Sequence, residues 1–238
     1  MSYTPGILCV SIDNSDTNSL SIEAAQRRKS LMQLIERYDV PANWTVAELG
    51  TIELPENAEV SVKVPRQLNR TEMLRYVRLA SASLLRVNSG LTSVVLDPHE
   101  AREHWDIFVR QGCSVTRPRT AGVTSDITPR IARGGLWVVP LTCQFVGGSP
   151  RSVRSLFGVC QRYLVDTVRQ GGLFHLNVDI GNDRASWTEE MRAIETLMKV
   201  SQDQRAKGRL RCATLSELPA ILTKKPSKPM HSILRRAA

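Results

Sequence analysis

The sequence predicts an α/β protein whose mostly parallel strands form a closed or distorted barrel. First, helical and strand-like apolar patterns alternate along the chain, and parallel neighbours need a crossover helix between them. Second, neither Gly-x-Gly-x-x-Gly nor Gly-x-x-x-x-Gly-Lys follows the first apolar run, which disfavours the nucleotide-binding open sheets that share this alternation. Third, 238 residues suit one large domain better than two. We expect that domain to span residues 1–223.

The first strand is expected at Ile7–Ile12, an apolar run that stops at Asp13-Asn14. In β/α proteins the ends of strands are where side chains converge on a bound molecule. A helix is expected at Ile22–Tyr38, because apolar residues recur there at helical spacing. A second strand follows at Val40–Val46 and is entered through a proline.

The remaining elements continue the alternation. Short strands rich in Val, Leu and Ile are expected at 59–64, 93–97, 113–117, 136–141, 173–178 and 211–215. Amphipathic helices are expected at 71–86, 98–111, 152–169 and 187–206.

The formal net charge of +9 is unevenly distributed. Residues 224–238 carry five cations and no acid, and we expect them to form a flexible basic tail. Such a tail could bind nucleic acid or another anionic surface, or it could serve solubility alone. A second excess lies between residues 110 and 169, where nine arginines face two acids. Because arginine binds anions in a planar, bidentate manner, Arg117 and Arg119 are candidates for holding an anionic ligand.

The five cysteines are odd in number and widely spaced, without a zinc-type Cys-x-x-Cys pair. Free thiols packed in a reducing compartment explain them best. Residues 1–20 hold no apolar signal core, and no uninterrupted apolar run is long enough to cross a bilayer. We therefore expect a cytoplasmic protein with no membrane partner.

Two strand endings resemble those of a known enzyme family. Ser11-Ile12-Asp13-Asn14 and Pro41-Ala42-Asn43-Trp44-Thr45-Val46 are similar to the Thr-Phe-Asp-Asp-Gly and Pro-Ala-Thr-Phe-Phe-Val sequences of the polysaccharide deacetylases of the NodB-homology type. The resemblance implies a distorted (β/α) barrel that hydrolyses amides or esters of carbohydrates with a divalent metal. It also implies that Asp13 is the catalytic base and that Asn14 stands where the family has a metal-binding Asp.

The resemblance further implies that the parent metal site is lost. The family's other two ligands are histidines four residues apart after the third strand, and Lys63 and Gln67 stand in their places. The chain has no histidine before His99. Amide and ammonium groups are poor zinc ligands, so we expect no metal and no other cofactor. Asn14, Lys63 and Gln67 then become candidates for contacting a ligand.

Two later motifs complete the comparison. The family's Arg-Pro-Pro-Tyr segment, whose arginine holds the catalytic Asp, would fall at residues 96–99, where no arginine occurs. The family's late Leu-x-His strand, which supplies the general acid, matches Leu173-Phe174-His175. The resemblance thus implies that Asp13 and His175 share one cleft. The carboxylate would then raise the pKa of His175 above about 6.5, while burial would act in the opposite direction.

Each of these residues has a simpler structural explanation. Asp13 fits a turn or helix cap, His175 fits a hydrogen-bonded core histidine, and Lys63 fits a strand residue that faces solvent. The sequence therefore leaves open a deacetylase-like enzyme that acts without metal. The alternative is a binding or scaffold protein that holds a small carbohydrate, an anionic ligand or a partner at an arginine-rich barrel mouth.

Overall fold

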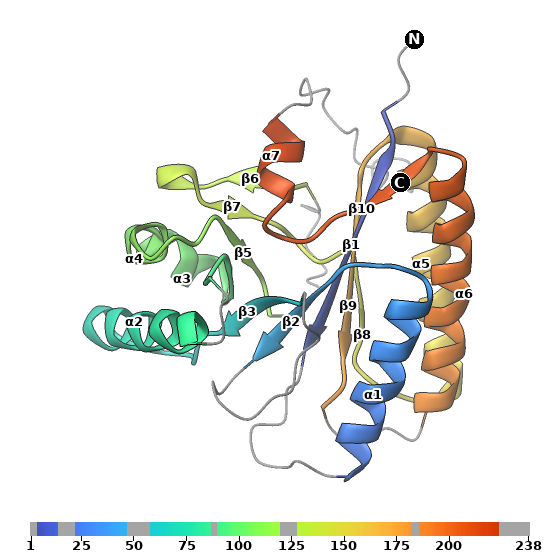
Figure 1. Ribbon diagram of the computed structural model, residues 1–238, viewed down its shortest axis with the longest axis horizontal. Coiled ribbons are helices and arrows are strands. Elements are labelled where there is room, and N and C mark those ends of the chain that lie inside the picture. The colour runs from blue at the N-terminus through green and yellow to red at the C-terminus, as the bar shows by residue number, and fades with distance from the viewer. Residues whose placement is uncertain are drawn as a thin grey trace, which may run out of the picture.

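A single curled, mostly parallel sheet forms the centre of the molecule (Figure 1). The computed structural model describes residues 4–13, 22–46, 58–86, 90–119, 128–181 and 186–223. Along the sheet the strands follow the order β6-β7-β5-β4-β3-β2-β1-β9-β8, and β10 also pairs with β1. The strands are β1 (Gly6–Asp13), β2 (Ala42–Val46), β3 (Glu59–Lys63), β4 (Ser93–Val95), β5 (Val115–Arg117), β6 (Arg130–Ile131), β7 (Trp137–Val138), β8 (Cys143–Phe145), β9 (Leu173–Asp179) and β10 (Leu210–Cys212). The predicted α/β class with a distorted barrel is confirmed.

Strand β1 lies inside this sheet and has three partners. β9 pairs with it in parallel from Ile7 to Asp13. Its other edge is shared, because β10 pairs with its first residues and β2 with its last four. The ends of the strand order are β6 and β8, and no ladder joins these two ends in the part of the chain that the structure describes. The barrel is therefore incompletely closed.

Helices cover the outside of the sheet in two groups (Figure 1). α1 (Ile22–Arg37), α5 (Pro150–Gln170) and α6 (Trp187–Ala206) lie beside β1 and β9, while α2 (Arg70–Arg86), α3 (Pro98–Glu103) and α4 (Trp105–Arg110) lie beside β3, β4 and β5. The short α7 (Leu218–Thr223) follows β10. In the described residues no helix is long and apolar enough to span a membrane.

Alternation along the strands separates an outer face from an inner face. On β1, Leu8, Val10 and Ile12 pack with the core beneath α1, α5 and α6. Ile7 and Cys9 point the other way, into an apolar cluster with residues from β5, β9 and α7. This cluster closes the amino end of the barrel interior. The inner side chains beyond it, toward the carboxyl ends of the strands, are mostly polar.

Several elements differ from the sequence-based expectation, and β6, β8 and α7 were not expected at all. The helix expected at 98–111 is divided at His104, whose φ of −118° and ψ of 17° separate α3 from α4. The strand expected at 136–141 is reduced to β7, and β8 forms after it. Pro140 lies between them and has no backbone N–H, so the β7 ladder cannot continue through it. Asn14 and the tail at 224–238 lie outside the described residues.

Candidate functional site

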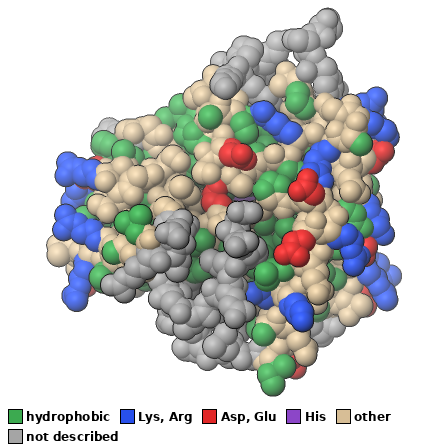
Figure 2. All heavy atoms as spheres, in the orientation of Figure 1, with side chains coloured by type: hydrophobic (Ala, Val, Ile, Leu, Met, Phe, Trp, Pro, Cys, Tyr) green, Lys and Arg blue, Asp and Glu red, His purple; other side chains and the backbone are tan. Residues whose placement is uncertain are grey.

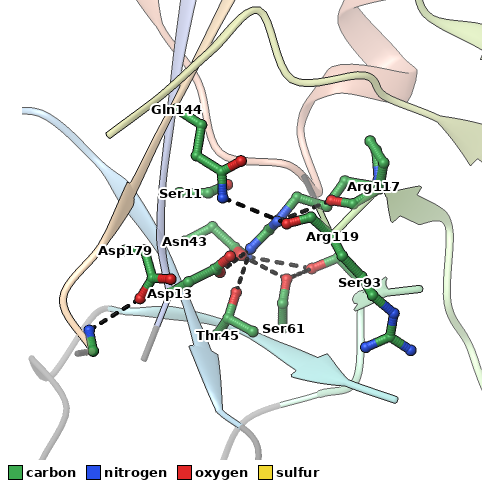
Figure 3. A network of polar contacts seen from close by, with 12 residues as sticks. Ser11, Asp13, Asn43, Thr45, Ser61, Ser93, Arg117, Arg119, Gln144 and Asp179 are labelled. Atoms are coloured by element: carbon green, nitrogen blue, oxygen red, sulfur yellow. Dashed lines mark hydrogen bonds and ion pairs between the residues drawn. The ribbon is translucent and has the colours of Figure 1, made fainter. Parts of the chain in front are cut away.

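The carboxyl end of the sheet holds a buried ion pair between distant strands. Asp13 is the last residue of β1, and its carboxylate accepts a hydrogen bond from Nη2 of Arg117, the last residue of β5. The same nitrogen lies 2.7 Å from Thr45 Oγ1 on β2. Arg117 is fully buried and Asp13 is 3% exposed. Figure 3 shows the guanidinium reaching across the barrel interior to both partners.

This geometry corrects one sequence-based placement. The resemblance to deacetylases implies an arginine that holds the catalytic Asp, and the motif was placed at residues 96–99, where that arginine is missing. The structure instead has Arg117 on Asp13, and Pro118 follows it. The placement was wrong by one strand. Arg117 was also a candidate for contacting a ligand, but its guanidinium is enclosed and bonded to Asp13 and Thr45.

Beneath this pair lie five polar residues in two hydrogen-bonded groups, which we together call the buried polar layer: Ser11 with His175, and Asn43 with Ser61 and Ser93. All five are fully buried. Ser61 donates to Asn43 Oδ1 at 2.5 Å, so the 2.5 Å contact between Ser61 and Ser93 is donated by Ser93. The Asn43 amide also donates to Glu59 Oε1 at 2.8 Å. These hydrogen bonds join β2, β3 and β4 inside the barrel.

His175 belongs to this layer and is held as a neutral ring. Its Nδ1 lies 3.1 Å from the Pro140 carbonyl, which can only accept, so Nδ1 carries the proton. Its Nε2 then accepts from the Ser11 hydroxyl at 2.8 Å. Burial, together with the nearby charge of Arg117, lowers the pKa of His175 to about 3, and the Pro140 carbonyl and Asp13 oppose this only in part. Asp13 does act to raise this pKa, but the expected value above about 6.5 was wrong because burial outweighs the carboxylate.

The depth of His175 separates it from Asp13. In the parallel register of β1 and β9, Cys9 is opposite His175, and Asp13 is opposite Asp179. His175 therefore lies four residues below the level of Asp13, which is about 13 Å along a strand. The two predicted catalytic residues do not meet, and Asp179 is the β9 residue at the level of Asp13. The sequence motif located the strand correctly but gave the wrong depth.

The more accessible candidates lie at the carboxyl ends of β3, β4 and β5, which we call the mouth. Lys63 is half-buried, and its ammonium forms no ion pair with any described acid. Gln67 is exposed in the turn after β3, with a left-handed φ of 61°. Arg119 is 8% exposed and bonds to the Val64 carbonyl. Its guanidinium also lies 3.5 Å from the Asp97 carboxylate.

Asn177 is a site residue that sequence reasoning missed. It is fully buried on β9, in register with Ser11 on one side and Gln144 on the other. Neither its amide nitrogen nor its amide oxygen has a hydrogen-bond partner. An unsatisfied buried polar group costs about 1–3 kcal/mol. Nothing in the sequence marks this residue, because its lack of partners depends on strands far apart in the chain.

The residues present do not fit the zinc site that the resemblance implies. Lys63 and Gln67 offer an ammonium and an amide at the two histidine positions, and Asn14 lies outside the described residues. The described ranges contain no group of three or more His, Cys, Asp or Glu side chains that could hold a metal ion. The available donors are the nitrogen-rich side chains typical of anion binding, which a divalent cation would not select.

Comparison with solved structures shows which known proteins share this fold. No family model and no curated protein sequence matches the chain. A solved structure described as a polysaccharide deacetylase, from Mycobacterium smegmatis, is similar with a TM-score of 0.66 and 12% identity, covering 97% of this chain and 98% of that one. The chain has the fold of polysaccharide deacetylases. A second such structure, from Pseudomonas aeruginosa PAO1, gives a TM-score of 0.61 at 10% identity, covering 93% of this chain and 92% of that one. The Puue allantoinase gives a TM-score of 0.64 at 8% identity over the same shares.

Proposed function

We propose that this protein is a deacetylase-like barrel that binds a ligand at its mouth and has lost metal-dependent hydrolysis. The observation that carries the proposal is the mouth itself, where Lys63 and Gln67 replace the histidines expected of the parent site. His175 adds support, because a buried imidazole with two hydrogen bonds and a low pKa cannot donate a proton at neutral pH.

A small anionic ligand, such as an acidic sugar, suits this mouth best. The ammonium of Lys63, which has no ion-pair partner among the described residues, would attract it. The fold neighbours, named as polysaccharide deacetylases and an allantoinase, add carbohydrates and small amides as candidate ligands. Arg119 would support the same site from its edge, since its charge is only partly offset by carboxylates at 3.5 and 3.7 Å.

A second candidate is a metal-independent hydrolase of the same amide or ester class. Asp13 and its arginine partner favour it, because the resemblance implies this pair in active deacetylases. Lys63 would then stabilise the oxyanion in place of a metal. An ammonium does not activate a bound water as zinc does, so this candidate is the weaker one.

The cysteines support a cytoplasmic location for this activity. All five are free thiols, and four of them are buried. Burial raises the pKa of Cys113 to about 12, so this thiol stays protonated and unreactive at neutral pH.

We further propose that residues 1–223 form the whole folded domain and that 224–238 act as a flexible basic tail.

The deciding experiment combines metal analysis with ligand binding. Elemental analysis of the purified protein should find no stoichiometric transition metal, and added zinc should not produce deacetylation of N-acetylated oligosaccharides. A thermal-shift panel of acidic and neutral sugars should find acidic ones that stabilise the protein. Lys63→Gln should abolish that shift, and Lys199→Gln on the distant α6 should not. Zinc-dependent turnover by the wild-type chain would overturn the proposal.

A further inference from the structure

The outer face of α5 carries a row of arginines that the proposed mouth does not use. The helix runs from Pro150 to Gln170 and buries Val153, Cys160, Leu164, Thr167 and Val168 against the sheet and its neighbours. Its four basic residues are Arg151, Arg154, Arg162 and Arg169, and all four are exposed. At 3.6 residues per turn they fall within an arc of about 80°, and they extend over about 27 Å. We call them the α5 arginine row.

The row lacks the acidic partners that exposed arginines usually have. The helix holds one acid, Asp166, which is half-buried and forms no ion pair with Arg162 or Arg169 despite its spacing. None of the four arginines forms an ion pair with another described residue. Among the described residues, only Arg154 has a hydrogen bond that the side chain donates, from its Nε to the Pro150 carbonyl. Within the part of the chain that the structure describes, these four positive charges therefore have no acidic partner.

The neighbouring helix α6 has a different charge pattern from α5. α6 has almost the same length and packs beside α5 (Figure 1). Its basic residues alternate with acids, and Lys199 and Lys207 form ion pairs with Glu195 and Asp203 one turn earlier. Such mixed charge is typical of a surface that faces only water. An all-arginine face without acids indicates a polyanionic partner.

The chemistry of the row favours the phosphate backbone of duplex nucleic acid. Guanidinium groups bind phosphate in a bidentate manner. Because a duplex carries one phosphate per about 1.7 Å of axis, a 27 Å row can meet one phosphate with each arginine. A membrane surface would require several apolar side chains beside the cations. Among large apolar residues α5 exposes Val165 alone in the described chain, which is too little for membrane binding. A single strand would require exposed aromatic rings, but Phe157 and Tyr163 are half-buried.

We propose that the α5 arginine row is a docking surface for the phosphate backbone of duplex nucleic acid. It contacts phosphates and reads no bases, so binding is independent of sequence and sensitive to salt. This surface is independent of the mouth, since α5 lies outside the sheet and the mouth lies at the ends of β3, β4 and β5. Nucleic-acid binding by α5 can therefore be tested independently of ligand binding at the mouth.

The test measures fluorescence anisotropy of a labelled 20-base-pair duplex with the full chain between 50 and 200 mM salt. Four phosphate contacts predict that log K falls linearly with log salt, with a slope of about −3.6 or steeper. The variant Arg151→Gln/Arg154→Gln/Arg162→Gln/Arg169→Gln should lose at least tenfold in affinity at 50 mM salt, and its slope should fall by about 3.6. All four changes are at exposed positions, so thermal unfolding should confirm an unchanged fold.

A charge-matched control separates the row from net charge. Arg75→Gln/Arg78→Gln/Arg102→Gln/Arg110→Gln removes four exposed arginines from α2, α3 and α4, on the other side of the sheet (Figure 1). This control should change affinity less than twofold. Equal loss in both variants would overturn the proposal, as would absence of duplex binding. Binding that is lost only on deleting residues 224–238 would also overturn it, and so would preferential binding to phosphatidylserine vesicles.

Discussion

The buried polar layer and the mouth lie two residues apart on β3 and have opposite character. In the layer, Ser61 is fully buried and bonded to Asn43 and Ser93. Two residues later, Lys63 is half-buried and has no ion-pair partner among the described residues. Polar side chains in this barrel are therefore not all functional. Those whose partners are complete hold the strands together, and those that lack partners at the rim remain available to a ligand.

On the face shown in Figure 2, Lys and Arg side chains gather at the two sides of the molecule, over α2 and over α1 and α6. Acidic groups lie nearer the middle of this view. The difference between buried and rim side chains can be tested by substitutions, taken here from the largest expected effect on the free energy of unfolding to the smallest.

The largest effect is expected from Arg117→Met. It leaves the Asp13 carboxylate buried without its partner, which should cost about 3–5 kcal/mol in urea unfolding. The double variant Arg117→Met/Asp13→Asn removes the stranded charge and should recover part of the loss. A cost below about 1 kcal/mol for the single change would show that Asp13 reaches solvent.

A second effect concerns pH and His175. Its pKa is about 3 in the folded protein and about 6.5 when unfolded, so the unfolded state binds the extra proton between these values. Stability should therefore decrease as the pH falls below about 6.5, by about 2 kcal/mol from this residue between pH 7 and pH 5. His175→Gln keeps a polar side chain but cannot titrate. If wild type and His175→Gln lose stability equally over this range, the imidazole is not buried as described.

A smaller effect is expected from Ser61→Ala. The change leaves Asn43 Oδ1 without its donor and Ser93 without its acceptor, and the loss should be about 1–3 kcal/mol. Ser81→Ala on α2, outside the layer, is the matched control and should be nearly neutral. Equal effects of the two changes on the urea midpoint would contradict a special role for the layer.

The smallest effect on stability is expected from Lys63→Gln. Because the side chain is half-exposed and has no ion-pair partner in the described ranges, the free energy of unfolding should change by less than about 0.5 kcal/mol. The same variant should lose binding of an acidic ligand. Loss of stability comparable to that of Ser61→Ala would instead assign Lys63 to the structural layer.

Most of the elements could be predicted from the sequence, because apolar periodicity is a local property. The helix expected at Ile22–Tyr38 is present as Ile22–Arg37, and the strand expected at Ile7–Ile12 is present as Gly6–Asp13. The short strand β8 was missed since its three residues follow a proline and carry no period of their own. Its place in the sheet depends on pairing with β9, which lies nearly thirty residues later.

The site could be predicted only in part, because depth and pairing are tertiary properties. Asp13 was located from the end of its strand, but its partner Arg117 comes from a strand 104 residues later. The position of His175 below the mouth follows from the register of β9 on β1, which no local motif encodes. Asn177 has no sequence signal for the same reason. Motifs identified which strands matter, and register determined which residues on them face the mouth.

The position of β1 in the sheet also has a consequence for synthesis of the chain. β1 is made first, but β9 and β10 lie at Leu173–Asp179 and Leu210–Cys212, close to the end of the described chain. One edge of this apolar strand therefore stays unpaired until most of the protein has left the ribosome. Contacts of such long sequence separation slow folding and leave a strand edge open to aggregation. During translation β1 is thus exposed to aggregation until β9 and β10 have been made.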